Sequence, residues 1–276
     1  MSKQRQISIL ADTSIGMTDT VKERVILIPQ YYYFEENKVY SENNGLTKDE
    51  FYNKLETKRA YTSGCNPAEA ENLFKQELAK GNQIICLAMS SKLSSTYNTL
   101  KMVAESLKDE EFPNADIEVI DTKTISLGTS FLVEKIVEFI EDGKEFKEIT
   151  DNIKDLTEKV QIYFVVDDLK YLARGGRINN SIAKIGDVLN IKPILHVRDG
   201  EIEVHSKVRG TKTAIKNLDN IVKKSSIDKI GIVKLNNENL FNELSTKIGV
   251  NDYVDLGLVI ASHIGPNAIS SVFLCK

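Results

Sequence analysis

The first half of the chain alternates short apolar runs with segments whose apolar residues recur at helical spacing. The runs of strand length are ISILAD, which ends in Asp12-Thr13-Ser14, then Val25–Pro29, Ile84–Met89 and Ile117–Ile120. Helical spacing follows over residues 66–80, 93–107, 126–141 and 144–159. Because buried strands alternate with helices, this pattern predicts a parallel α/β sheet.

Local signals mark the ends of several elements. Thr47 with Glu50 three residues later is a capping box, which predicts a helix start. Asn66 followed by Pro67 predicts another helix start, and Gly81 ends that helix. The alternating aromatic residues of 31–42 predict a hairpin that turns near Glu36-Asn37.

The second half is less regular and contains hairpins. We predict a strand at 161–166, a helix at 179–189, a hairpin at 192–210 that turns at Asp199-Gly200, a helix from 211, a strand at 228–235, a helix at 237–248, and strands at 253–261 and 269–274. The fold class is therefore α/β with two domains. Residues 1–160 form an α/β/α layer with a parallel sheet, residues 161–276 form a two-layer α/β unit with a mixed sheet, and the ligand site lies between them.

One stretch, residues 83–99, combines a buried strand, a polar turn and a helix start. Its turn carries five hydroxyls, on Ser90, Ser91, Ser94, Ser95 and Thr96. The free N–H groups and positive dipole at a helix start make such a turn an anion site. One of these serines could instead be only the N-cap of the helix. From this stretch alone the two interpretations are equally supported.

Other hydroxyls follow the same arrangement. Thr62 and Ser63 precede the helix start at Asn66, and Asp121-Thr122 follows a strand. Since the carboxyl ends of parallel strands meet at one edge of a sheet, we expect these polar groups to gather there.

Composition narrows the class of protein. The 276 residues carry a net charge of −4, which argues against general nucleic-acid binding. No apolar run approaches the length of a membrane span, and the N-terminal apolar stretch ends at Asp12, too early for a signal peptide. The three scattered cysteines predict a reducing cytoplasm.

Several chemistries have weak support. The three histidines and the cysteines lack metal-ligand spacing, and the chain has no P-loop or G-x-S-x-G motif. Cys65 with His263 could form a nucleophile and base, but a small residue in a turn is the favoured interpretation. Asp12 could accept a phosphoryl group if Asp167-Asp168 supplied magnesium ligands, although that pair more simply caps a helix.

Two further motifs each allow two interpretations. Arg174-Gly-Gly-Arg177 is either an exposed basic docking point or a structural turn, because a single copy is weak support for RNA binding. His263, which precedes a Gly-Pro turn, could donate to an anion, and a packed loop histidine is the plainer alternative.

Taken together, these motifs give the chain a resemblance to the DegV family of bacterial fatty-acid-binding proteins. The resemblance covers nearly the whole length and depends on ADTS at 11–14, YTS and NP within 61–67, SSKLSSTY at 90–97, Asp121, LKYLARGGRI at 169–178, the KPIL, DG and VRG segments within 192–210, and HIGPNA at 263–268. The chain departs from the family pattern at Lys92, Ser95 and Asn267, where glycines are usual.

The resemblance implies a carrier that holds one long-chain fatty acid of the palmitate, stearate or oleate type, with no other cofactor and no metal. It implies that Thr62, Ser63, Ser94 and His263 hold the carboxylate, with Ser91 and Gly265 as additional pocket residues. It also implies delivery to a separate ATP-dependent fatty acid kinase, which forms an acyl phosphate for phospholipid synthesis. Arg174, Arg177 and Arg209 are the residues we assign to kinase or phosphate contact.

These expectations leave three classes of function. The first is a lipid carrier without catalysis, which touches membranes at most transiently. The second is a phosphotransferase or hydrolase that uses the same Ser, Thr and Asp turns. The third is a structural or regulatory module without ligand or turnover. Residues around Ile191–Leu195 and Val259–Ala261 are candidates for the lining of an apolar tunnel.

Overall fold

A parallel four-stranded sheet forms the centre of the first half of the chain. The computed structural model describes residues 5–34, 38–42, 44–179, 182 and 190–276. All four strands run in the same direction, in the order β2 (Val25–Ile28), β1 (Ile7–Asp12), β6 (Gln83–Ala88) and β7 (Ile117–Asp121). The predicted parallel α/β sheet is therefore confirmed.

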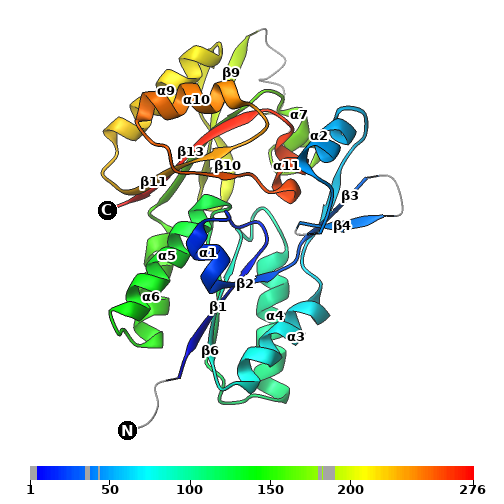
Figure 1. Cartoon of the computed structure of the whole chain (residues 1–276), viewed down its shortest axis with the longest axis vertical. Helices are drawn as coiled ribbons and strands as arrows, with labels where there is room; N and C mark the ends of the chain where they lie inside the picture. Colours follow the sequence, from blue (N-terminus) through cyan, green and yellow to red (C-terminus); the bar gives the residue numbers. More distant parts are fainter. Residues whose placement is uncertain (1–4, 35–37, 43, 180–181, 183–189) are drawn as a thin grey trace.

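Helices cover both faces of this sheet (Figure 1). Because side chains alternate along a strand, Ile84 and Cys86 face one layer while Ile85 and Leu87 face the other. The first layer contains α3 (Pro67–Ala79) and α4 (Thr96–Glu110), and the second contains α1 (Asp19–Arg24), α5 (Leu127–Glu141) and α6 (Phe146–Thr157). This is the α/β/α layering that the sequence predicts.

A small antiparallel sheet extends from the first half. Its order is β4 (Val39–Ser41), β3 (Tyr31–Tyr33) and β5 (Tyr61–Ser63), and α2 (Lys48–Thr57) packs beside it through Phe51. The hairpin of 31–42 is confirmed in its two strands, while its turn at Glu36-Asn37 lies outside the described residues. The sequence analysis missed β5, which places Thr62 opposite Tyr32.

The second half contains a mixed sheet of six strands. Their order is β10 (Glu201–Arg209), β9 (Ile191–Arg198), β8 (Val160–Val166), β13 (Ala268–Cys275), β11 (Ile227–Lys234) and β12 (Tyr253–Asp255), with only β11 and β12 parallel. The helices α9 (Thr211–Lys224) and α10 (Glu238–Ile248) cover one face. The other face packs against the first half (Figure 1).

Two short helices lie where the halves meet, α7 (Lys170–Arg174) and α11 (Leu258–Ile264). The predicted strand over 253–261 is wrong beyond Asp255, because residues 258–264 are helical. The cause is a distant carboxylate: Glu42 accepts hydrogen bonds from the N–H groups of Leu258 at 2.5 Å and Val259 at 2.8 Å. Glu42 thereby satisfies N–H groups that a helix start leaves unpaired.

The remaining predictions fall on two segments. The predicted helix 179–189 lies mostly outside the described residues. The domain boundary after residue 160 stays a prediction, because one apolar cluster continues across both halves, from Leu87 of β6 to Val272 of β13.

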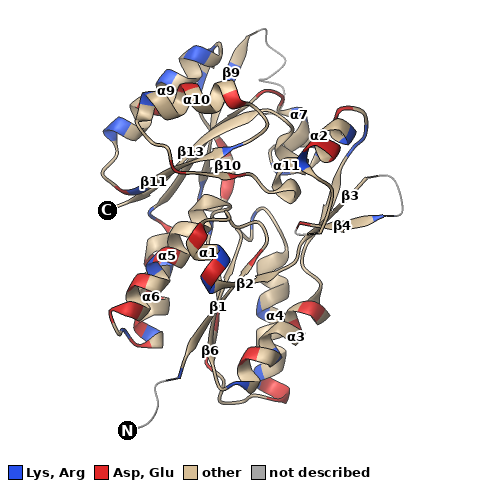
Figure 2. Cartoon of the chain, viewed as in Figure 1, with Lys and Arg blue, Asp and Glu red and all other residues tan. Residues whose placement is uncertain are grey.

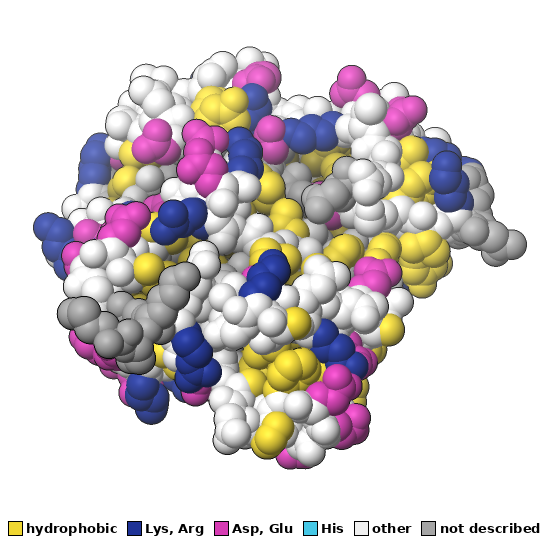
Figure 3. Space-filling model, turned by 60° about the horizontal axis from the view of Figure 1, so that its bottom comes forward, with side chains coloured by type: hydrophobic (Ala, Val, Ile, Leu, Met, Phe, Trp, Pro, Cys, Tyr) yellow, Lys and Arg dark blue, Asp and Glu magenta, His cyan; other side chains and the backbone are white. Residues whose placement is uncertain are grey.

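Charge is spread over the outer surface. Acidic and basic side chains are interspersed along the outer helices, whereas the central strands carry few of them (Figure 2). The face in Figure 3 likewise mixes both signs around a hollow with apolar side chains at its centre. Among the described residues, no helix is long and apolar enough to cross a membrane.

Candidate ligand-binding site

A cavity of about 360 Å³ lies between the carboxyl ends of the parallel strands and the second half of the chain. Gln30 follows β2, Met89 follows β6, and Thr62 to Gly64 come from the small sheet. Residues 93–95 and Ile125 also come from the first half, and the second half contributes residues of α7, β10 and α11 together with Arg177. The cavity therefore occupies the edge of the sheet where parallel α/β folds bind their ligands.

The cavity is lined by both polar and apolar side chains. The polar side chains are Gln30, Thr62, Ser63, Ser94, Ser95, Arg177 and His263. The apolar ones are Met89, Leu93, Ile125, Leu172, Ile202, Val259, Ile260 and Ile264. Such a mixed lining suits an amphiphile, because hydroxyls can bind its headgroup and aliphatic side chains can contact its tail.

Thr62 and His263 are hydrogen-bonded across this cavity. Thr62 Oγ1 lies 2.8 Å from His263 Nε2. Burial, together with the charges of Arg177 and Arg59, lowers the pKa of His263 to about 4. The imidazole is therefore neutral at pH 7, and in the tautomer with its hydrogen on Nε2 it donates to Thr62. The Thr62 hydroxyl is then free to donate to a ligand.

Glycines let the helix α7 segment approach this pair. A Cβ atom on Gly175 would overlap Nδ1 of His263. The absence of a side chain at Gly175 therefore lets the backbone lie close to the imidazole. Gly176 adopts φ +72°, a left-handed conformation that favours glycine and ends α7. Asp168 accepts from Lys170 N at 2.8 Å, as expected of a cap for this helix.

The hydroxyl turn after β6 has mixed roles. Ser94 Oγ accepts from Thr96 N at 3.2 Å and lies 2.9 Å from Thr96 Oγ1. Ser90 Oγ donates to the carbonyl of Gly200 at 2.7 Å, which ties the turn to the β9–β10 hairpin. Ser95 occupies the N-cap of α4 without a side-chain capping bond. Ser94 and Ser95 thus line the larger cavity, whereas the hydroxyls of Ser90 and Thr96 form hydrogen bonds within the protein.

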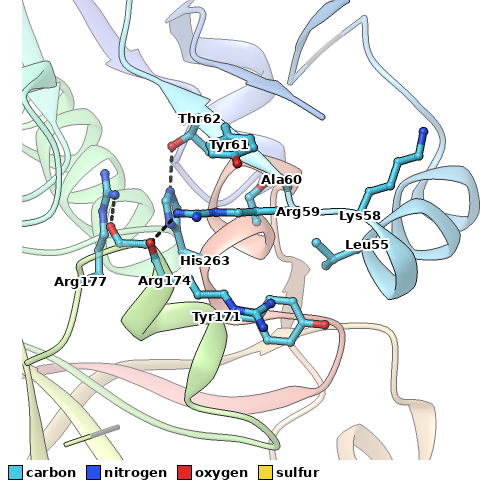
Figure 4. Close-up of a pocket in the computed structure, with 12 residues that line it drawn as sticks. Leu55, Lys58, Arg59, Ala60, Tyr61, Thr62, Tyr171, Arg174, Arg177 and His263 are labelled. Carbon is cyan, nitrogen blue, oxygen red and sulfur yellow. Dashed lines mark hydrogen bonds between the residues drawn. The ribbon is translucent and has the colours of Figure 1, made fainter. Parts of the chain in front are cut away.

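A second, smaller cavity of about 140 Å³ adjoins the first at Thr62, Arg177 and His263. It is shown in Figure 4, where dashed lines mark the hydrogen bond between Thr62 and His263 and the one from Arg59 to the carbonyl of Arg174. Its lining includes four cationic side chains, Lys58, Arg59, Arg174 and Arg177, and no Asp or Glu. This concentration of positive charge is typical of a site for an anion.

Hydrogen bonds and ring contacts hold two of these cations in place. The Arg59 guanidinium lies 4.7 Å from the ring centroid of Tyr61 and donates to the carbonyl of Arg174 at 2.8 Å. Arg177 Nε donates to the carbonyl of Leu93 at 3.1 Å, and its NH1 group donates to the carbonyl of Gly175. Burial lowers the pKa of Arg177. Both guanidinium groups are thus fixed in the wall of the smaller cavity.

The predicted headgroup residues therefore come together, while other candidates do not. Thr62, Ser63, Ser94 and His263 share one cavity wall, and Arg174 and Arg177 line the adjoining cavity. Ser91, Gly265 and Arg209 line neither, and Arg209 is exposed on β10. Val259 and Ile260 line the larger cavity, whereas residues 191–195 do not.

The three departures from the family pattern have separate environments. Lys92 Nζ forms an ion pair with Glu201 at 3.3 Å, so this lysine links the hydroxyl turn to β10. Ser95 lines the larger cavity. The carbonyl of Asn267 accepts from Asp167 N at 3.0 Å.

Asp12 and Cys65, the candidate catalytic residues of the enzymatic alternatives, are both buried. Asp12 is buried, and its carboxylate accepts from Ser14 N at 3.0 Å and from Met89 N at 2.7 Å. Desolvation by burial raises the pKa of Asp12. Burial also raises the pKa of Cys65 to about 12, which disfavours a thiolate. Within the described part of the chain no group of His, Cys, Asp and Glu could hold a metal ion.

The chain is thus an α/β protein with a cavity lined by residues of both of its halves. Residues 6–276 match the model of the DegV family, a family of uncharacterised proteins, and the chain belongs to that family. A DegV domain-containing protein of Caldanaerobacter subterraneus is 30% identical over 97% of this chain and 98% of its own length. One of Clostridium perfringens is 35% identical over 87% of each chain.

Solved structures of the family share the fold. The fatty-acid-binding DegV family protein of Streptococcus agalactiae is 29% identical, with a TM-score of 0.87 over 99% of each chain. The Fatty Acid Kinase (Fak) B3 protein of Streptococcus pneumoniae, loaded with linoleic acid, is 19% identical, with a TM-score of 0.86 over 98% of this chain and 100% of its own. At 19% identity, the similarity to the Streptococcus pneumoniae protein shows a shared fold.

The sequence analysis missed several cavity residues. Gln30, Lys58 and Arg59 line the cavities but belong to no strand-to-helix turn: Gln30 lies between β2 and β3, and Lys58 and Arg59 lie between α2 and β5. A signal was present at Gln30, since a polar residue between Pro29 and three tyrosines interrupts an otherwise apolar segment.

Proposed function

We propose that this protein binds one long-chain fatty acid and presents its carboxylate to a separate fatty acid kinase. The observation that carries the proposal is that one cavity is lined both by hydroxyl-bearing side chains, which we call the hydroxyl wall, and by aliphatic side chains. In this arrangement Thr62, Ser63, Ser94 and His263 receive the carboxylate, and the aliphatic side chains receive the tail.

The energetics of such a ligand favour this arrangement. Burying a palmitate tail contributes about 0.8 kcal/mol per methylene, roughly 11 kcal/mol before the costs of ordering. A buried carboxylate must be hydrogen-bonded, and hydroxyl groups supply neutral donors. A neutral His263 agrees with this, because the headgroup is then held without a direct charge pair on that side.

The smaller cavity supports the kinase step. Phosphoryl transfer to a carboxylate develops negative charge, which cationic side chains stabilise. The four cationic residues around the smaller cavity adjoin Thr62 and His263, the proposed position of the carboxylate. We therefore assign Arg174 and Arg177 to contact with the kinase or the transferred phosphate. Arg209, on β10, is a third but separate candidate for kinase contact.

In this proposal the chain is a carrier, and the kinase performs the chemistry. The acyl phosphate then enters phospholipid synthesis. We place the protein in the cytoplasm, in agreement with its three free cysteines.

The first experiment is mass spectrometry of the purified, denatured protein. A C14–C18 fatty acid should be released at one molecule per chain. The second incubates the loaded protein with ATP, with and without an ATP-dependent fatty acid kinase subunit. Acyl phosphate should form only in the presence of the kinase. Release of no fatty acid, with no uptake of added palmitate, would contradict the proposal. Turnover of ATP or an activated ester by the chain alone would instead favour the phosphotransferase or hydrolase alternative.

A further inference from the structure

Gln30 is a buried amide at the edge of the larger cavity that none of the motifs includes. It lies between β2 and β3 and is 1% exposed. Its backbone is fixed, since Gln30 N donates to Thr13 Oγ1 at 2.9 Å and the Gln30 carbonyl accepts from Glu42 N at 3.3 Å. Its side chain lines the same cavity as Ser94 and Thr62.

Met89 determines the orientation of this amide. Gln30 Nε2 lies 3.2 Å from the sulfur of Met89 and 3.0 Å from Thr96 Oγ1. A thioether sulfur accepts hydrogen bonds and cannot donate them. Rotating the amide by half a turn would place its oxygen against the sulfur. The amide therefore directs its NH2 group to Met89 and Thr96, and its oxygen is left without a hydrogen-bond partner.

This orientation sets the direction of a chain of hydroxyls. Thr96 Oγ1 accepts from Gln30 Nε2, so its own hydrogen is available for Ser94 Oγ, 2.9 Å away. Ser94 Oγ also accepts from Thr96 N at 3.2 Å, which occupies its second lone pair. The hydrogen of the Ser94 hydroxyl then has no acceptor among the described residues and remains available to a group in the cavity.

We infer that Gln30 is a positioning residue that makes the site selective for an anionic headgroup, by orienting the Ser94 hydroxyl as a donor toward the cavity. The inference rests on the proposed function. A carboxylate only accepts hydrogen bonds, so it needs a donor at Ser94. An alcohol both accepts and donates, so it pairs with Ser94 in either direction of the chain. The unpaired amide oxygen is the energetic cost of this fixed direction.

The test compares palmitate with hexadecanol, which has the same chain length and a neutral headgroup. Affinities are measured at pH 7.5 by displacement of a fluorescent fatty acid from the wild-type protein and from Gln30→Met, which keeps the volume and removes the donor. Palmitate affinity should fall about five- to tenfold, the effect of losing the neutral hydrogen bond that holds the Thr96 and Ser94 hydroxyls in the donating direction. Hexadecanol affinity should change less than twofold.

A second pair of variants keeps the test decisive if Gln30→Met does not fold. Thr96→Val removes the hydroxyl that links Gln30 to Ser94. It should lower the ratio of palmitate affinity to hexadecanol affinity to a similar extent, whereas Thr96→Ser keeps the hydroxyl and should keep the wild-type ratio. An equal loss for both ligands, or an unchanged palmitate affinity, would overturn the role of Gln30. A wild-type protein that binds neither ligand would overturn the proposed function instead.

Discussion

Thr62 Oγ1 and His263 Nε2 lie 2.8 Å apart, although 201 residues separate them in the chain. Thr62 belongs to β5 of the small sheet, and His263 belongs to α11 of the second half. This hydrogen bond therefore joins the two halves of the chain at the wall of the cavity, and it aligns a neutral imidazole with a hydroxyl that can meet a carboxylate.

The first prediction concerns the Thr62 hydroxyl. Thr62→Val keeps the shape of the side chain but removes the donor, so we expect palmitate affinity to fall about 10- to 100-fold. Thr62→Ser is the matched control and should remain within about threefold of wild type, since it keeps the hydroxyl. Titration with a fluorescent fatty acid measures both. Equal affinities for the valine and serine variants would rule out a headgroup role.

The second prediction is a pH dependence of stability. The pKa of His263 is lowered from 6.5 to about 4, so between these values the unfolded state binds more protons than the folded state. The contribution of His263 to the free energy of unfolding is therefore fully present above pH 6.5 and is lost as the pH falls toward 4. At pH 4.5 this loss is about 2.5 kcal/mol.

His263→Gln isolates this effect, because glutamine retains hydrogen-bonding capacity and does not titrate. Urea denaturation at pH 7.5 and 4.5 should show a larger drop in the free energy of unfolding for wild type than for the variant, by about 2 kcal/mol. The same drop in both proteins would mean that other groups cause the pH dependence.

The sequence predicted the elements whose signals are local. Thr47 and Glu50 form the expected capping box at α2, and Asn66 caps α3 with Pro67 in its first turn. The strands of the parallel sheet and the β9–β10 hairpin also lie where the apolar pattern places them. The caps and the hairpin turn depend on contacts between residues a few positions apart, and each buried strand is marked by its own apolar run, so the sequence contains these signals.

The elements that were missed depend on distant partners. Leu258 to Ala261 is an apolar run that suits a strand or a helix equally, and Glu42, which follows β4, decides for the helix. Likewise, Gln30 and Arg59 line the cavities together with residues that are distant in the chain. The proposed headgroup residues Thr62, Ser94 and His263 were assigned by family resemblance, and hydroxyl clustering alone did not connect them.

The third prediction concerns this long-range cap. Glu42→Gln removes the charge and one acceptor oxygen from the start of α11, which carries His263, Val259 and Ile260 into the site. We expect a loss of about 1–3 kcal/mol in the free energy of unfolding and a weaker affinity for palmitate. Glu50→Gln disrupts the exposed capping box of α2 and is the control: it should lower stability slightly and leave palmitate affinity unchanged. Unchanged stability of Glu42→Gln would show that α11 forms without the cap.

The fourth prediction concerns the close approach of α7. In Gly175→Ala the added methyl group would overlap His263 Nδ1, so the ring must move and its bond to Thr62 must lengthen. We expect palmitate affinity to fall at least tenfold. Gly143→Ala is the control, since it has open space around it and a positive φ of +75°. It should lower the melting temperature without changing affinity, which separates strain from an effect on the site.

The last prediction separates fatty acid binding from phosphoryl transfer. The Arg174 side chain is exposed and lines the smaller cavity, while its backbone carbonyl holds Arg59. Arg174→Glu leaves that carbonyl in place and reverses one charge beside the proposed carboxylate. Palmitate affinity should change less than threefold, because the hydroxyl wall is intact. Acyl phosphate formation with the kinase and ATP should slow at least tenfold, because the approaching phosphoryl group meets a like charge.

Arg209→Glu makes the same charge change on β10, outside both cavities. If the smaller cavity receives the phosphate, Arg209→Glu should retain most of the rate at physiological salt, and Arg174→Glu should not. If both variants slow the reaction equally and added salt slows wild type to the same rate, the arginines act by attracting an acidic kinase surface. In that case the smaller cavity has no special role in transfer, and Arg209 belongs to the docking surface together with Arg174.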